Sequence, residues 1–304
     1  MKPGRLITIG SFDGVHRGHQ ALIDRTVAEA RKREVKSLAL SFPMPPRMVL
    51  DRKTRRMILS DESEKGALLR RAGIDEVAML PFDAEMAAMR PFTFFRDVIL
   101  KKFKARGVVV GSDFRFGAGR SGGAFELVRW GQDFSIPVWV IAPVRFRRTV
   151  VSSTLVRTLF TEGRFQTASE FLGHPYLISG VVRPERGVGR KIGFPTANLA
   201  THPDKILPPG VFAVRGWIET KGGKRKLWPG VANIGVRPTF KAAGPAVEAH
   251  FFGDPGRLAG RRVSIELLRR LRSERRFRSP AALASQIEKD IAAARRFFRG
   301  NGRS

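Results

Sequence analysis

Short apolar runs alternate with amphipathic segments through the first half of the chain. The apolar runs, which predict buried strands, lie at residues 5–9, 35–42, 74–80, 107–111 and 139–142. Apolar positions spaced three or four residues apart predict helices at 20–33, 60–72 and 92–103. Strands that alternate with helices favour a parallel α/β sheet of the Rossmann-like kind.

The pattern changes after residue 173. Short β-rich runs separated by Gly and Pro turns lie at residues 177–182, 210–218, 226–234, 246–252 and 262–268. Such regular spacing predicts a small closed antiparallel barrel. A helix at 161–172 is expected to join the halves, and a C-terminal helix is expected at 279–298, with Ser279 as its N-cap and Pro280 following. We therefore predict an α/β domain at 1–168 and a β-barrel domain at 169–304.

Composition narrows the class of protein further. Of the 304 residues, 56 are Lys or Arg and 27 are Asp or Glu, a net charge of +29. Such a field attracts nucleic acid, acidic lipids or phosphorylated small molecules, but the basic residues are dispersed along the chain. The chain has no cysteine, and no apolar run approaches the ~20 residues of a membrane span. We expect a cytoplasmic protein with small-molecule substrates, no specific nucleic acid and no membrane partner.

A glycine loop follows the first predicted strand and precedes the first helix. Glycines let a backbone approach a ligand closely, and a helix start offers N–H groups to phosphate. His16 and His19 are three residues apart, so both imidazoles can face one bound nucleotide as catalytic donors. The expected ATP-binding residues of this loop are Gly10, Ser11, Phe12, Asp13, Gly14 and Gly18. The alternative is a solvated loop or a chance metal pair.

Two later segments could serve the same site. After the strand at 107–111, Asp113, Phe114 and Phe116 could contact a nucleotide or another ring, or they could form a core-capping turn. The second segment is a hydroxyl-rich helix start, which taken alone favours a simple N-cap but also offers phosphate donors. Its candidate residues are Ser152, Ser153, Thr154 and Arg157.

The most informative run of the second half lies at 187–198. Its glycines and cations could cradle a polyphosphate, through Gly187, Gly189, Arg190, Gly193, Phe194 and Pro195. Thr196 and Asn198 face one way in an extended segment, and their oxygens suit Mg²⁺. Glu248 could accept a proton from an alcohol that attacks ATP. The alternatives are a barrel loop with turn glycines and a solvated Glu248, which spacing alone favours.

The order of the motifs resembles a known family. Gly-Ser-Phe-Asp-Gly-Val-His-Arg-Gly-His at 10–19 resembles the His-x-Gly-His signature of nucleotidylyltransferases. With Val-Val-Gly-Ser-Asp-Phe-Arg-Phe-Gly at 109–117 and Val-Ser-Ser-Thr-Leu-Val-Arg at 151–157, it is similar to the FMN adenylyltransferase half of prokaryotic bifunctional riboflavin kinase/FAD synthetases. The resemblance implies in-line attack at the α-phosphate of ATP without a covalent enzyme intermediate.

The second half resembles the riboflavin kinase module of that family. The matching runs are Gly-Phe-Pro-Thr-Ala-Asn at 193–198, the segment 230–239 and Val-Glu-Ala-His at 247–250. The resemblance implies that Thr196 and Asn198 hold Mg²⁺ and that Glu248 is the base. It further implies that riboflavin and ATP give FMN and ADP, and that FMN and ATP then give FAD and pyrophosphate.

Two departures from the family pattern keep alternatives open. Met44-Pro45 stands where the family often has a histidine, and Pro184-Glu185 where it often has His-Gly. One half could therefore have lost its activity. A nucleic-acid-binding protein with degenerate nucleotide folds is the other alternative, and the net charge is its only support.

Overall fold

The computed structural model describes residues 3–50, 56–184, 194–219, 226–236, 245–275 and 277–301. The chain divides into two compact units, which are described separately. The first unit consists of Met1–Val156 with Phe171–Gly173, and the second of Arg157–Glu170 with His174–Ser304.

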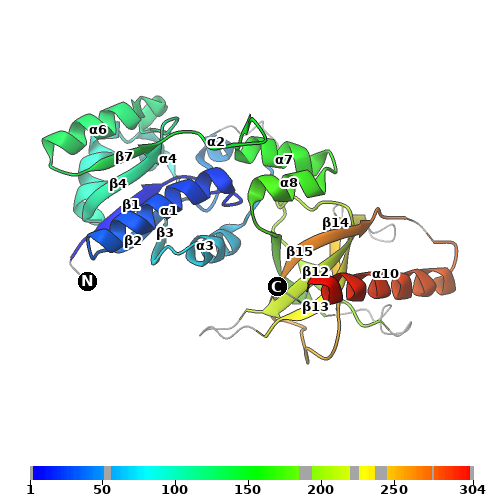
Figure 1. The fold of residues 1–304 in the computed structure, drawn as a ribbon. Helices are drawn as coiled ribbons and strands as arrows, with labels where there is room; N and C mark the ends of the chain where they lie inside the picture. Colours follow the sequence, from blue (N-terminus) through cyan, green and yellow to red (C-terminus); the bar gives the residue numbers. More distant parts are fainter. Residues whose placement is uncertain are drawn as a thin grey trace. The chain divides into compact units, whose positions relative to one another are not determined.

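The first unit is built on a 5-stranded parallel sheet with the order β3-β2-β1-β4-β7 (Figure 1). Its strands are β1 (Arg5–Ile9), β2 (Lys36–Ser41), β3 (Glu76–Met79), β4 (Ala105–Gly111) and β7 (Val138–Ile141). The five strands coincide with the five predicted apolar runs to within a few residues, and the three central strands, β1, β2 and β4, are the most buried. Two short hairpins complete the β-structure, β5 (Arg115–Phe116) with β6 (Gly122–Gly123) and β8 (Arg145–Phe146) with β9 (Thr149–Val150).

Helices connect these strands. They are α1 (Arg17–Lys32), α2 (Pro46–Leu50), α3 (Glu62–Arg71), α4 (Ala84–Ala88), α5 (Pro91–Thr93), the π-helix η1 (Phe94–Lys102), the 3₁₀ turn η2 (Ala118–Arg120) and α6 (Ala124–Asp133). The predicted helix at 92–103 is thus a short α-helical turn followed by a π-helix. The sequence pattern did not reveal α2, α4 or α6.

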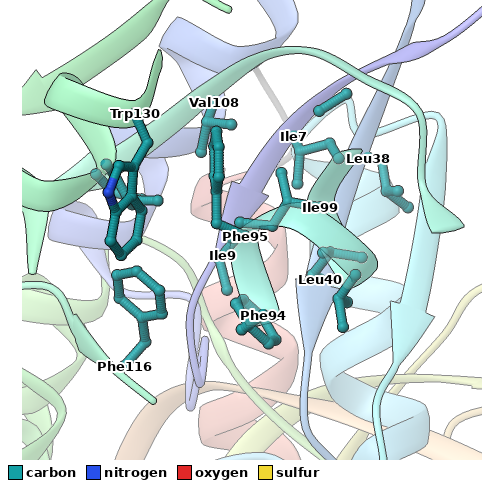
Figure 2. Packing of buried hydrophobic residues seen from close by; sticks show 14 of the residues in the cluster. Ile7, Ile9, Leu38, Leu40, Phe94, Phe95, Ile99, Val108, Phe116 and Trp130 are labelled. Atoms are coloured by element: carbon teal, nitrogen blue, oxygen red, sulfur yellow. The ribbon is translucent and has the colours of Figure 1, made fainter. Parts of the chain in front are cut away.

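The two faces of the sheet have separate apolar layers. On one face, Leu6 and Val109 pack with Ala30 of α1 and with Val35. On the other face, aromatic side chains dominate, and Figure 2 shows Phe94 and Phe95 of η1 beside Phe116 and Trp130. The strand residues Ile7, Ile9, Leu38, Leu40 and Val108 complete this second layer. The sheet is therefore the middle of three layers, as the alternating pattern predicts.

The second unit is a closed barrel with the order β10-β11-β14-β13-β12-β15. Its strands are β10 (Tyr176–Arg183), β11 (Ala197–Ala200), β12 (Gly210–Ile218), β13 (Trp228–Val236), β14 (Pro245–Phe251) and β15 (Arg262–Arg272). All neighbouring pairs are antiparallel, and β15 pairs with both β10 and β12 to close the ring. The prediction of a small closed antiparallel barrel is confirmed.

Side chains on alternate positions fill the barrel. Phe212, Ala232 and Ala249 are fully or almost fully buried and occupy matching positions on β12, β13 and β14. Aromatic rings of the preceding helices pack at Phe212 and Tyr176, since Phe165 lies 4.9 Å from the Phe212 ring and Phe160 lies 4.4 Å from the Tyr176 ring. These two phenylalanines therefore belong to the core of the barrel unit.

The C-terminal helix α10 (Pro280–Asn301) packs against β12, β13 and β15 (Figure 1, red). Ala294 is fully buried against Ala213 and Val231. Arg272, the last residue of β15, donates two hydrogen bonds to Asp290 of α10, from Nε at 3.0 Å and from a terminal nitrogen at 2.8 Å. The predicted C-terminal helix is confirmed.

The predicted helix at 161–172 is wrong in its boundaries. Two helices, α7 (Ser153–Thr161) and α8 (Phe165–Leu172), occupy this region. Gly163 separates them with a φ of +73°, a left-handed conformation in which glycine lacks the steric penalty of other residues. Its N–H donates to Phe160 and the N–H of Arg164 donates to Leu159, so α7 ends in hydrogen-bonded turns.

Candidate active sites

The strand order reverses between β1 and β4. From β1 the chain passes through α1 to β2 on one side, whereas β4 pairs with β1 on the other side. Ligands of open α/β sheets bind where the strand order reverses in this way. The glycine loop, which follows β1, and Ser112-Asp113, which follow β4, therefore meet at one edge of the sheet.

His16 and His19 stack on each other at the beginning of α1. Their ring centroids are 3.7 Å apart with an interplanar angle of 16°. His16 is the N-cap of the helix, and its Nδ1 accepts a hydrogen bond from the His19 N–H at 3.4 Å. Because Nδ1 is the acceptor, the proton of a neutral His16 ring is on Nε2.

Phe12 packs against this pair of histidines. Its ring meets the His19 ring edge to face at 5.2 Å, and Phe12 itself is fully buried. Phe12 has a φ of +44° and Val15 a φ of +43°, both in the left-handed region that bulky residues rarely adopt. Such backbone strain persists where the surroundings fix the chain, which is common at functional loops.

Asp13 joins the glycine loop to a distant segment of the first unit. Its carboxylate is fully buried and accepts hydrogen bonds from the backbone N–H groups of Leu59 and Ser60, both at 2.9 Å to Oδ1. The Gly14 N–H donates in turn to the Ser60 hydroxyl at 2.9 Å. Asp13, which is also a predicted ATP contact, thus fastens the glycine loop to the segment that begins α3.

Three glycines of the loop, Gly10, Gly14 and Gly18, pack tightly. A Cβ on Gly14 would come within 2.8 Å of Leu59, and φ at Gly14 is +79°. A Cβ on Gly18 would lie 3.1 Å from the His16 ring, and one on Gly10 would lie 3.3 Å from the Phe12 ring. Small residues therefore allow the loop to fold around the stacked histidines. Ser11 lies beside β2, because its carbonyl accepts from the Ser41 hydroxyl at 3.2 Å.

The hydroxyl-rich helix start joins the same site. The Ser153 hydroxyl donates to the Asp13 carbonyl at 3.0 Å, and the Ser152 hydroxyl accepts from the Leu155 N–H at 3.2 Å. Ser152 is thus the N-cap of α7, as the local pattern predicts. Thr154 is exposed, and Arg157 is half-buried further along α7 among the residues of the second unit.

The three predicted contacts after β4 differ in exposure. Asp113 is exposed, Phe114 is half-buried and Phe116 is buried. The Phe114 and Phe116 rings stack at 5.3 Å, and Phe116 also packs against Phe94 at 5.7 Å. Phe116 is therefore part of the core, whereas Asp113 and Phe114 lie where a ligand can reach them.

A second cluster of polar residues lies on the outer face of the barrel. Asn198 of β11 is directly opposite Glu248 of β14, and Glu248 is directly opposite Asn233 of β13. On the other side of Asn198, Arg183 of β10 continues the row. Directly opposed side chains lie about 5 Å apart at Cβ. Residues 50 positions apart in the sequence thus form one polar row, while their neighbours Val247 and Ala249 are buried in the barrel.

Thr196 and its neighbours lead into this row. Thr196 and Phe194 are half-buried and Pro195 is exposed. The Pro195 carbonyl lies 2.9 Å from Nδ1 of His250, and the Phe194 ring meets the His250 ring at 5.9 Å. His250 therefore holds the segment before β11 against β14. Four predicted phosphate contacts, Gly187, Gly189, Arg190 and Gly193, lie outside the described residues.

Sequence reasoning missed Asn233 and Glu274 as members of this cluster. Gly235 is two residues after Asn233, and the Glu274 carboxylate occupies the space that a Cβ at Gly235 would fill. Glu274 follows β15, so no local pattern connects it with Glu248. For Glu274 the signal in the sequence was the glycine at 235, because a close approach requires the absence of a side chain.

The donor set of the row fits Mg²⁺. Thr196 and Asn198 provide neutral oxygens and Glu248 a carboxylate, and Mg²⁺ binds few protein oxygens together with substrate phosphates. Within the described ranges, no group of three or more His, Asp or Glu side chains could hold a metal ion by itself. A magnesium ion at this row would complete its coordination with water and phosphate oxygens. No helix in the described part of the chain is long and apolar enough to cross a membrane.

Fold and sites together define a nucleotide-dependent transferase with an α/β nucleotidyl-transfer unit and a barrel unit. The FAD synthetase family model matches residues 1–155, and the riboflavin kinase family model matches residues 172–298. The chain belongs to the bifunctional riboflavin kinase/FMN adenylyltransferase family. It is an enzyme whose barrel forms FMN from riboflavin and whose α/β unit forms FAD from FMN.

Relatives match over nearly the whole chain. The bifunctional riboflavin kinase/FMN adenylyltransferase of Escherichia coli K12 is 36% identical, covering 97% of this chain and 93% of the relative. The proteins of the same name from Pseudomonas fluorescens and Haemophilus influenzae are 34% and 32% identical, covering 96% and 97% of this chain and 92% and 94% of the relatives. A crystal structure titled macrolide-efflux protein from Streptococcus pneumoniae superposes with a TM-score of 0.80 at 27% identity, covering 97% of this chain and 95% of that one.

Proposed function

We propose that each of the two clusters performs one of the two reactions, with the barrel row acting as the kinase site and the stacked histidines as the adenylyltransferase site. The observation that carries the proposal is the register of the barrel, which sets Asn198 directly beside Glu248. These two residues are 50 positions apart in the sequence, and the barrel brings them together.

In the kinase reaction, Glu248 accepts the proton of the ribityl 5′-hydroxyl of riboflavin. The hydroxyl oxygen attacks the γ-phosphate of ATP, and the products are FMN and ADP. Thr196 and Asn198 hold Mg²⁺, which when bound neutralises phosphate charge. Asn233 and Glu274 position the base, because Asn233 is the neighbour of Glu248 on β13 and Glu274 packs on Gly235 of the same strand.

In the adenylyltransferase reaction, a phosphate oxygen of FMN attacks the α-phosphate of ATP. His16 and His19 donate to the α-phosphate as charge accumulates on it, and N–H groups at the start of α1 add to the positive field. Pyrophosphate leaves and FAD forms. Gly10, Gly14 and Gly18 allow the close approach, Ser152, Ser153 and Thr154 offer further donors, and Asp113 and Phe114 are available to the flavin.

Both reactions consume ATP, so we infer that the chain works in the cytoplasm, with ATP, riboflavin and FMN as its small-molecule partners. The net charge of +29 assists the capture of anionic ATP and FMN.

A time course with riboflavin, ATP and magnesium tests the assignment. The unaltered chain is expected to form FMN first and FAD afterwards. His19→Ala lowers FAD formation from added FMN by roughly 10²–10³-fold, the cost of removing one donor to a transition-state oxyanion. Glu248→Gln lowers FMN formation from riboflavin by roughly 10²–10⁴-fold, the usual contribution of a general base.

Each variant should leave the other reaction within twofold of the unaltered enzyme. His202→Ala is the matched control, since His202 lies in the barrel unit outside its strands and accepts a local hydrogen bond from the Asp204 N–H at 3.2 Å. Loss of both reactions in either variant contradicts two separate sites. An inactive chain under every condition contradicts the proposed function itself.

A further inference from the structure

The side chain of Gln20 joins two distant segments of the first unit. Its amide nitrogen donates to the Val15 carbonyl at 3.0 Å and to the Leu172 carbonyl at 2.9 Å. An amide nitrogen has two N–H donors, and these two bonds use both of them. Both partners are carbonyl oxygens, which fixes the orientation of the amide. Gln20 directly follows His19 on α1, so it connects the histidine pair with a residue 152 positions away.

Val15, the first of these partners, has a backbone conformation that needs support. It is buried and has a φ of +43°, in the left-handed region that β-branched residues avoid. The Gln20 N–H donates to the His16 carbonyl at 3.0 Å while the Gln20 side chain donates to Val15. One residue thus holds two consecutive carbonyls. Because His16 is the N-cap of α1 and accepts from the His19 N–H, a rotation of the Val15–His16 peptide would move the His16 ring.

The second partner lies in a short segment, Phe171–Gly173, that belongs to the first unit. Leu172 is fully buried. Gly173 has a φ of +80°, and a Cβ there would lie 2.9 Å from Cγ of Arg17 and 3.1 Å from Oε1 of Gln20. The segment therefore packs directly against the first turn of α1. The FAD synthetase family model ends at residue 155, so this support comes from a part of the chain that the model does not cover.

We propose that Gln20 is a positioning residue of the adenylyltransferase reaction, which sets the His16 ring by holding the Val15 carbonyl, with the Leu172 carbonyl as its second anchor. The inference rests on the proposed function of the first unit, and Gln20 acts through His16. A catalytic donor must lie within a fraction of an ångström of its productive position. Since the histidines act on charge that develops in the transition state, a displaced ring lowers kcat more than it weakens ATP binding.

The first test is Gln20→Met in the full chain, which keeps a side chain of similar length and removes both N–H donors. We expect kcat for FAD formation from FMN to fall roughly tenfold, the factor that corresponds to one or two hydrogen bonds. The KM for ATP and the rate of FMN formation should stay within twofold. Gln132→Met is the matched control, because Gln132 is exposed on α6 of the same unit.

The second test approaches the same contact from the other side. Gly173→Ala places a Cβ where Arg17 and the Gln20 amide now lie, so both must shift. Gly163→Ala is its control, because Gly163 has a similar φ of +73° and open space where a Cβ would be. Both variants have the strain of a left-handed alanine. We expect kcat for FAD formation to fall at least threefold further in Gly173→Ala than in Gly163→Ala.

Imidazole nitrogen NMR of the full chain without substrate gives a readout that is independent of turnover. The chain has five histidines, and His16→Asn identifies the His16 signals. We expect Gln20→Met to shift the signal of His16 Nδ1 and Gln132→Met to leave it unchanged.

The outcomes separate this inference from the proposed function. If His19→Ala lowers FAD formation but Gln20→Met leaves kcat unchanged, the positioning role is overturned while the adenylyltransferase site stands. A lower melting temperature of Gln20→Met with unchanged kcat and unchanged His16 signals also overturns it, because Gln20 would then serve only the fold. An unaltered chain that forms no FAD contradicts the proposed function, and the NMR comparison still decides whether Gln20 sets the His16 ring.

Discussion

At the residue scale, Asp13 shows how a motif residue can serve the fold of its loop. Its buried carboxylate pairs with the backbone of Leu59 and Ser60, 46 and 47 residues away. A sequence reading sees Asp13 inside a phosphate-binding loop and assigns it to the phosphate. The partner segment cannot be found from spacing, since Leu59 and Ser60 come near Asp13 only in the folded unit. By contrast, His16 and His19 could be predicted, because helical spacing alone puts both rings on one face.

Replacing Asp13 with Ala leaves the N–H groups of Leu59 and Ser60 buried without their acceptor. Each unsatisfied buried donor costs about 1–3 kcal/mol, so we expect Asp13→Ala to destabilise the chain by about 2–4 kcal/mol. The measurement is the urea midpoint at which FAD formation is lost. Asp24→Ala, at an exposed position on α1, should change stability by less than about 0.5 kcal/mol. Equal midpoints for both variants would contradict the anchoring role.

At the element scale, ion pairs tie together the amino ends of three neighbouring strands. Glu76 at the start of β3 accepts a hydrogen bond from Arg5 of β1 at 2.6 Å and pairs with Lys36 of β2 at 2.9 Å. The hydrogen bond from Arg5, followed by that from Lys36, holds the pKa of the Glu76 carboxyl below its ordinary value of 4.5. This network lies at the opposite edge of the sheet from the histidines.

Because the pKa of the Glu76 carboxyl is lower in the folded chain than in the unfolded chain, its ion pairs with Arg5 and Lys36 stabilise the folded chain at a pH above the unfolded pKa. The contribution is therefore complete above about pH 5 and is lost as the pH falls through the lowered pKa. Glu76→Gln should reduce stability at pH 7 by about 0.5–1 kcal/mol, a value discounted for solvent screening, and flatten the stability profile below pH 4.5. Unfolding midpoints between pH 3 and pH 7 check this. A pH profile of stability for Glu76→Gln that runs parallel to that of the unaltered chain would contradict the prediction.

Most strands could be predicted from their apolar runs, whereas several helices and turns could not. Buried parallel strands such as β4 are short continuous apolar segments, and this pattern is typical of strands covered on both faces. The short helices α2 and α4 have too few turns to show a helical period. The pattern did not predict the break at Gly163, because apolar residues continue on both sides of it. Phe160 and Phe165 lie on either side of the break, and their rings pack together.

At the scale of the whole molecule, the excess of positive charge has a measurable consequence. ATP and FMN are anions, whereas riboflavin is uncharged. The salt dependence of KM can therefore be compared between charged and uncharged substrates of the same enzyme. Salt shortens the range of the field to ~10 Å at 0.1 M and ~3 Å at 1 M. Raising the salt concentration from about 0.05 M to about 0.5 M should increase the KM for ATP and FMN by roughly two- to tenfold.

The KM for riboflavin should change by less than twofold over the same range, because no long-range charge draws riboflavin in. Initial rates with each substrate varied in turn give the three constants. A parallel rise of all three would indicate a general salt effect on the protein and would contradict electrostatic capture.

Closure of the barrel through β15 sets the order in which the chain can fold during synthesis. The sheet of the first unit is complete once Ile141 has been made, whereas β10 and β12 lack their partner until the ribosome has passed Arg272. Contacts across such long separations form late and slowly. The unit that forms FAD can therefore fold while the barrel that forms FMN is still being synthesised. We expect a chain truncated before β15 to form FAD from FMN but not FMN from riboflavin.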